Sequence, residues 1–177
     1  VHFDAHTDCY ENLDHFLGAK KSAAHWASYL VRQGNVDAKT STQIGIRGNP
    51  RTLDWLKPSY DLGYQVITMN EFQTIGLKKS SEKILNRLGD EPIYVTFDLD
   101  CLDSSVAPAA ANIEPAFKGF SIDEARKLLQ SLKGKNIIGG DVACLIPTKD
   151  YRNNITSMVA ASIMFEIISL ISVNLRK

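Results

Sequence analysis

The chain has 177 residues, 44% of them hydrophobic, which suffices for one domain with a core and is short for two. Its 20 Lys and Arg residues balance its 20 Asp and Glu residues, which argues against a basic surface for nucleic acid or an anionic membrane. We therefore expect a single domain over residues 1–177 whose partner is a small molecule or another copy of the chain.

The cysteine content indicates a reducing compartment. Cys9, Cys101 and Cys144 are odd in number and lack CxxC spacing, so they predict neither a disulfide framework nor a structural zinc site. No charged segment precedes an apolar signal region, and the longest apolar stretch, "MVAASIMFEIISLISV", carries Glu166 and is short of a membrane span. We expect a cytoplasmic location and no membrane partner.

Short β-branched runs alternate with longer helical patterns along the chain. Strand patterns cover residues 1–3, 42–48, 64–69, 92–100 and 136–145, and helical patterns cover 23–34, 51–57, 81–89, 121–133 and a segment from about 155. This alternation predicts an α/β fold, a three-layer α/β/α sandwich around a mainly parallel sheet. Ser121 and Glu124 have capping-box spacing at the start of a helix that should run to about Leu132.

Acidic residues gather where two of these strands end. In "DAHTD", Asp4, His6 and Asp8 can point the same way if the segment is extended. Asp98 and Asp100 can do the same in "FDLD". Bare carboxylates at neighbouring strand ends would repel, and divalent cations relieve that repulsion. Oxygen and imidazole donors without a thiolate suit manganese or nickel better than structural zinc.

Either motif alone is ambiguous. A single DxD at a strand end also marks phosphohydrolase nucleophiles, sugar-nucleotide sites and solvated turns. A phosphohydrolase with Asp98 as nucleophile and Asp100 as its partner leaves "DAHTD" without a role. The two motifs together favour two divalent metal ions, held about 3.5–4 Å apart by a shared carboxylate. The irregular stretch "CLDSSVAPAAANIEPAFKGF" follows the second motif, where α/β sheets place their ligands.

These motifs resemble the arginase, agmatinase and ureohydrolase superfamily, in its agmatinase-like branch. "HFDAHTDCYEN" is similar to the family's second metal motif, "QIGIRG" to its following strand, and "VTFDLDCLD" to its third metal motif. "NIIGGDVACLIPTKDYRNNITSMVAASIMFEII" is similar to the closing strand and helix, so the resemblance extends from end to end.

The resemblance implies a role for each ligand. Asp4 and Asp98 would bridge two metal ions. Asp8 would complete the coordination of the first ion, and His6 and Asp100 would bind the second. The resemblance also implies hydrolysis of a guanidino compound to urea and an amine, with Asp100 relaying a proton to the leaving nitrogen. Asp100 as a ligand alone is the alternative.

The family also uses a histidine after "DAHTD" to assist the substrate, in a His-Gly pattern that this chain lacks. His15 and His25 are the candidates, and His25 is preferred because it lies nearer the expected helix start. A histidine beside a tryptophan on an apolar helix is equally a packed core residue.

Two departures from the family concern the substrate. The family's closing motif is Asp-Val-x-Glu, whose glutamate receives the guanidinium, and "GGDVACLIP" has Cys144 at that position. Loss of this carboxylate should weaken the binding of ordinary substrates. The family's glycine-rich loop is replaced by the bulkier "APAAANIEPAFKG", which indicates a smaller pocket and a compact substrate such as free guanidine or a short guanidino acid. The alternative for Cys144 is a small packing residue.

The third departure is the start of the chain. Family members have a further N-terminal segment whose Gly-Gly-Asp-His strand end supplies a histidine to the first metal. We therefore expect a C-terminal portion that lacks the N-terminal strands, exposes apolar sheet surface and is inactive alone. A catalytically inactive metal-binding or scaffold module is the competing function. Because members of the family form trimers and hexamers, the resemblance implies a homo-oligomer of one of these sizes.

Overall fold

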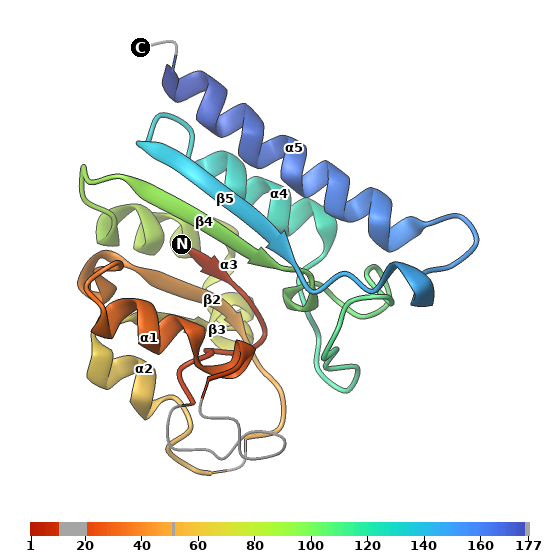
Figure 1. Ribbon diagram of the computed structural model, residues 1–177, viewed down its shortest axis with the longest axis horizontal. Coiled ribbons are helices and arrows are strands. Elements are labelled where there is room, and N and C mark those ends of the chain that lie inside the picture. Colours follow the sequence, from red (N-terminus) through yellow and green to blue (C-terminus); the bar gives the residue numbers. More distant parts are fainter. Residues whose placement is uncertain (11–20, 51, 176–177) are drawn as a thin grey trace.

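A five-stranded parallel sheet forms the centre of the protein. The structure is a computed structural model that describes residues 1–10, 21–50 and 52–175. The strands are β1 (His2–Phe3), β2 (Thr42–Ile46), β3 (Gln65–Thr68), β4 (Ile93–Asp98) and β5 (Ile137–Ala143). Their spatial order is β3-β2-β1-β4-β5, and every pair is parallel (Figure 1). The predicted parallel sheet is therefore confirmed.

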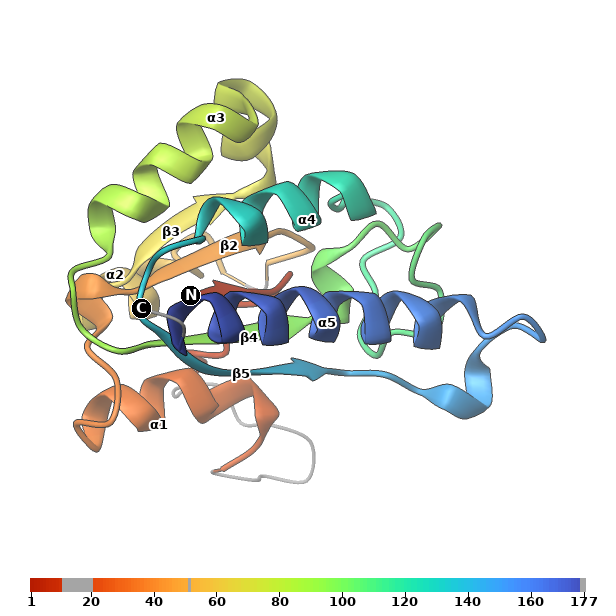
Figure 2. The same cartoon turned by 90° about the horizontal axis from the view of Figure 1, so that it is seen from above.

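Helices cover both faces of this sheet. On one face lie α1 (Trp26–Arg32) and α2 (Lys57–Leu62). The other face carries α3 (Met69–Arg87), α4 (Ile122–Ser131) and α5 (Ile155–Leu175), as Figure 2 shows. Short 3-10 helices span Ala23–His25, Ala38–Thr40, Leu99–Cys101 and Pro147–Lys149. The three-layer α/β/α sandwich predicted from the alternating pattern is the fold that the chain adopts.

Helix ends follow the capping chemistry of the sequence. Ser121 and Glu124 form the predicted capping box, and α4 ends with Leu132 as its C-cap. The helical pattern at 51–57 is displaced in the structure, because Pro58 favours the first turn of α2 and Gly63, at φ 102°, ends it. The pattern at 81–89 is only the second half of α3, which begins at Met69 and is interrupted at Gly76.

The core lies between the sheet and helices α3, α4 and α5. The rings of Phe3 and Phe97 stack at 5.2 Å, and those of Phe72 and Phe120 meet edge to face at 4.8 Å. A Cβ at Gly45 would lie 2.8 Å from the carbonyl oxygen of Asp4 and 2.9 Å from the Phe120 ring. Glycine in β2 therefore lets the segment after β1 pack closely over the sheet.

Apolar side chains remain exposed at β4, β5 and α5. On the face that carries α1 and α2, these two helices lie over β2 and β3 and leave β4 and β5 open (Figure 1). Tyr94 and Ile138 in these strands are exposed. On α5, Met158 and Phe165 are exposed as well.

Helix α5 is longer than the sequence pattern predicted. Among the described residues it is one helix of sufficient length and apolarity to cross a bilayer, with 21 residues and a mean hydropathy of 1.9. The expectation that this stretch is too short for a span is therefore wrong, because the helix includes residues on both sides of the apolar run. Its inner face, including Ile163 and Ile167, is buried in the core beside β5 and α4. A helix that covers a sheet meets the same criteria.

Candidate metal centre

Two tight turns bring the predicted ligands together. Asp4 Oδ1 accepts a hydrogen bond from the backbone nitrogen of His6 at 2.6 Å, and Asp98 Oδ1 accepts one from that of Asp100 at 2.9 Å. Both motifs thus fold as Asx turns directly after a strand. The expected alternation along an extended segment is wrong for these residues, since β1 ends at Phe3 and β4 ends at Asp98. The turns place the paired side chains on one side instead.

The first group of possible ligands is Asp4, His6 and Asp100. Phe3 pairs with Phe97 across β1 and β4, so the two turns lie side by side at the carboxyl edge of the sheet. Asp100 Oδ1 accepts a hydrogen bond from the backbone nitrogen of Ala5 at 3.0 Å. His6 Nδ1 lies 3.0 Å from Asp100 Oδ2 and 3.4 Å from Asp4 Oδ1. One ligand atom from each group member lies within 4.8 Å of the others, close enough to hold a metal ion.

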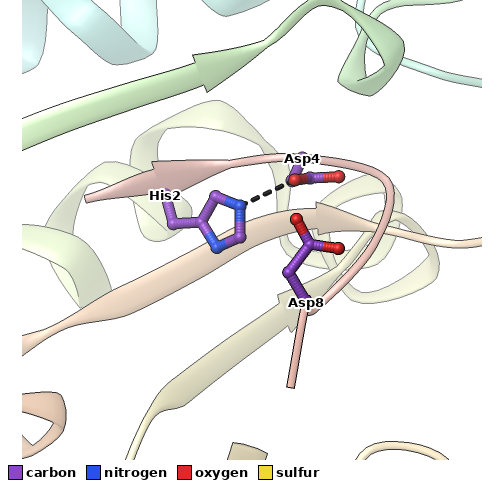
Figure 3. A group of neighbouring side chains, drawn as sticks. All are labelled: His2, Asp4 and Asp8. Atoms are coloured by element: carbon purple, nitrogen blue, oxygen red, sulfur yellow. Dashed lines mark hydrogen bonds and ion pairs between the residues drawn. The ribbon is translucent and has the colours of Figure 1, made fainter. Parts of the chain in front are cut away.

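A second group, His2, Asp4 and Asp8, shares Asp4 with the first. Their potential ligand atoms also lie within 4.8 Å of one another, and Figure 3 shows the three side chains gathered around β1 and the turn after it. Asp8 has a left-handed backbone, at φ 50°, and accepts a hydrogen bond from Trp26 Nε1 at 2.6 Å. Asp8 was a predicted ligand, whereas His2 and Trp26 were not.

Hydrogen bonds give His2 an orienting role. Gln43 Nε2 donates to the carbonyl oxygen of Thr7 at 2.6 Å and lies 3.1 Å from His2 Nδ1. His2 Nδ1 therefore accepts, and His2 Nε2 carries the hydrogen that is donated to Asp4 Oδ2 at 2.7 Å. With both ring nitrogens engaged, His2 holds the carboxylate of Asp4, which the two groups share, in one orientation. Sequence spacing missed this residue because its partner Gln43 comes from β2.

Asp98 and Cys144 adjoin these groups without belonging to either. Asp98 is 8% exposed, and the thiol of Cys144 donates a hydrogen bond to its carboxylate. Cys144 follows β5 with a left-handed backbone, at φ 66°, and its carbonyl oxygen accepts from the nitrogen of Ala111 at 2.7 Å. The predicted bridging role of Asp98 and the substrate role of Cys144 stay predictions.

Burial and mutual repulsion shift the ionisation of the acids. Burial and Asp4 raise the pKa of Asp8 to about 7, and burial, Asp4 and Asp100 raise the pKa of Asp98 to about 7. Burial and Asp4 raise the pKa of Asp100 to about 6 against the opposing effect of His6. Burial also acts to raise the pKa of Asp4, but His2 and His6 outweigh it and hold that pKa well below its usual range.

The residues present fit divalent cations. The donors are carboxylate oxygens and an imidazole nitrogen, and Asp4 belongs to both groups, as a carboxylate shared by two ions requires. Each of the three acids with a raised pKa is repelled by another acid of the cluster. A cation removes this repulsion, so the charge arrangement favours occupancy by metal.

The remaining predicted residues lie elsewhere. His25 is 1% exposed at the start of α1, where its Nδ1 lies 2.9 Å from Ser22 Oγ and its ring meets Tyr29 edge to face. Its role toward the substrate stays a prediction. His15 lies outside the described residues. Glu114, which the sequence analysis did not single out, lies 3.2 Å from His6 Nε2.

The chain matches known proteins over almost its whole length. A sequence profile described as the arginase family matches residues 1–169. The chain is 34% identical over 170 residues to an agmatinase from Neisseria meningitidis serogroup C, covering 96% of the chain and 50% of the relative. It is 32% identical to a mitochondrial guanidino acid hydrolase from Homo sapiens, covering 95% of the chain and 46% of the relative.

The fold has equally clear relatives among solved structures. A proclavaminate amidino hydrolase from Streptomyces clavuligerus superposes with a TM-score of 0.85 at 28% identity, covering 98% of this chain and 55% of that one. The chain spans about half the length of the curated relatives it matches. Its two acidic motifs, its parallel sheet and the family match over residues 1–169 show that the chain belongs to the arginase family.

Proposed function

We propose that the chain forms the metal-binding part of a ureohydrolase that uses two divalent ions, Mn²⁺ or Ni²⁺, to release urea from a guanidino compound. This proposal depends on one observation: Asp4 belongs to both groups of possible ligands, as a carboxylate that bridges two ions would. The relatives named as agmatinase and guanidino acid hydrolase support the guanidino substrate class. Asp4 and Asp98 would bridge the ions, Asp8 would complete one, and His6 and Asp100 would hold the other.

The chain's own residues prepare the site for hydrolysis. Bound cations would supply an activated water and polarise the guanidinium. Asp100 accepts from Ala5 through Oδ1 and meets His6 through Oδ2, so its carboxylate is held in one orientation. Asp100 would relay the proton to the leaving nitrogen from this fixed position.

Cys144 supports a compact substrate. Burial and the hydrogen bond to Asp98 raise the pKa of the Cys144 thiol, so the thiol is neutral near pH 7 and offers no charge to a guanidinium. Ala110 forms an isolated β-bridge with Leu145, and the backbone nitrogen of Ala111 donates a hydrogen bond to the carbonyl oxygen of Cys144. The loop after the second acidic motif is therefore held against the segment that follows β5. Both the missing charge and the tied loop disfavour a long amino-guanidine.

Calorimetric titration of the full chain with Mn²⁺ and with Ni²⁺ tests the metal centre. Asp4→Asn should weaken both binding events, because it removes charge from the shared ligand. The matched control is Asp90→Asn at an exposed position, which should bind as the wild type does. Equal binding by the Asp4 variant and the wild type would contradict the proposal.

Urea release tests the substrate. We expect the metal-loaded natural full-length protein to act faster on guanidine or a short guanidino acid than on agmatine or arginine. Cys144→Glu restores a carboxylate and should shift the preference toward the longer substrates. If agmatine is the preferred substrate and the Cys144 variant leaves that preference unchanged, Cys144 serves only packing and the compact-substrate proposal fails.

A further inference from the structure

Glu114 contacts a metal ligand from outside the ligand set. It lies in the segment between β4 and α4, and its Oε1 is 3.2 Å from His6 Nε2. The side chains of His6 and Glu114 are only 24% and 23% exposed, so the contact is partly sheltered from water. We infer that Glu114 is a positioning residue that directs Nδ1 of His6 toward the metal, an inference that rests on the proposed metal centre.

The chemistry of the carboxylate and the imidazole determines which atom donates the hydrogen bond between Glu114 and His6. A carboxylate can only accept, so the ring nitrogen that faces Glu114, Nε2, must carry a hydrogen. A neutral imidazole with its hydrogen on Nε2 has its lone pair on Nδ1. Nδ1 is the atom that lies beside Asp100 and Asp4, in the group that could hold an ion. Asp100 faces Nδ1 as Glu114 faces Nε2, so when an ion takes the place of the hydrogen on Nδ1, Glu114 keeps the remaining hydrogen on Nε2 and selects the tautomer that can bind there.

The backbone on the far side of Glu114 leaves room for its carboxylate. A Cβ at Gly48 would lie 2.6 Å from the carboxyl carbon of Glu114 and 2.7 Å from Oε1. The adjacent Arg47 is buried and donates to the carbonyl oxygens of Asp100, Cys101 and Leu102 at 2.7–3.2 Å. The end of β2 is thus tied to the Asp100 turn. His6 lies between Asp100 at Nδ1 and Glu114 at Nε2.

Titration of the full chain with Mn²⁺ alone tests the assignment. Glu114→Ala should bind Mn²⁺ about 10–100-fold more weakly, the usual effect of removing such a partner. Glu114→Gln keeps an acceptor oxygen and should recover part of the loss. Glu91→Ala, at an exposed position, is the matched control and should bind normally. Thermal unfolding without metal checks that each variant folds.

A double-mutant cycle with His6→Ala separates positioning from other roles. If Glu114 acts through His6, Glu114→Ala should cost nothing further in the His6→Ala background. An equal loss in both backgrounds, or no loss in either, would overturn the assignment while leaving the metal centre standing. If the wild type itself binds no Mn²⁺, the metal centre and the assignment both fall.

Discussion

Metal binding by this chain should release protons, and the number released should rise as the pH falls. His6 must lose a proton to bind through Nδ1: burial lowers its pKa, but Asp100 and Asp4 outweigh burial and raise it to about 12. The pKa of Asp98 is about 7 and that of Asp100 is about 6, so both also hold protons in mildly acidic solution. Glu114, which faces the other side of His6, favours retention of the proton on Nε2.

The structure gives the expected magnitude for an ion held by His6, Asp98 and Asp100. At pH 8 the two acids are ionised and His6 alone supplies about one proton, so apparent affinity should change about tenfold per pH unit. Near pH 5 all three groups carry protons, and about three are displaced. Each displaced proton contributes about 1.4 kcal/mol per pH unit to the binding free energy. Affinity should therefore fall steeply below pH 7.

The stability of the metal-free chain should follow the same groups. The folded-state pKa of Asp98, about 7, lies above its ordinary value of 3.8. The folded chain therefore binds this proton more tightly than the unfolded chain does, and the free energy of unfolding decreases as the pH rises from about 4 to about 7. Asp8 and Asp100 act with the same sign. Stability supplied by protonated His6 is complete below about pH 6.5 and declines above it.

Calorimetry in buffers of different protonation enthalpy counts the released protons directly. Mn²⁺ binding measured from about pH 5.5 to about pH 8 covers the range over which the proton count should change. Thermal unfolding with and without Mn²⁺ should show a metal-induced stabilisation that increases with pH. His6→Asn should reduce the proton count by about one at pH 8. A proton count of zero, or one that is the same at both ends of the range, would refute the reasoning.

Two further predictions concern single backbone and cap positions. Gly48→Ala should weaken Mn²⁺ binding more than Gly34→Ala does: both glycines have positive φ, at 103° and 74°, but only a Cβ at Gly48 meets Glu114. Calorimetry on the two variants measures the difference, and equal affinities would exclude the steric effect. Ser121→Ala should lower the free energy of unfolding by about 1 kcal/mol in urea titration, because it removes the cap of α4. An unchanged unfolding midpoint would show that the cap contributes nothing.

Local pattern was sufficient for the sheet and for the edge at which the two acidic motifs meet. The carboxyl ends of parallel strands meet at one edge, so two acidic strand ends in one short α/β chain had to lie close together. The family resemblance added the prediction of which acids share an ion. The backbone conformation was less predictable than the location: the side chains of Asp4 and His6 meet through an Asx turn, since the strand before them is only two residues long.

Tertiary pairing decided what the sequence could not show. His2 faces Gln43 because β1 and β2 pair in that register, and no spacing within either segment reveals it. Trp26 reaches Asp8 from α1, and Glu114 reaches His6 from 108 residues away. The lengths of α3 and α5 were predicted wrongly for a related reason. Packing of α3 on β2 and β3, and of α5 on β5, stabilises helical turns that local propensity alone does not predict.

The two residues that the sequence could not reveal act alike. His2 donates from Nε2 to Asp4, and Glu114 accepts from Nε2 of His6, so each orients a ligand from the side away from the cluster. They belong to different segments, and Gln43 and Gly48, which support them, lie in or directly after β2. The "DAHTD" segment alone therefore carries ligands without the groups that orient them. In the proposed metal centre, metal affinity would therefore depend on the assembled sheet edge, and the free energy of binding would be coupled to the folding of β1, β2 and the segment before α4.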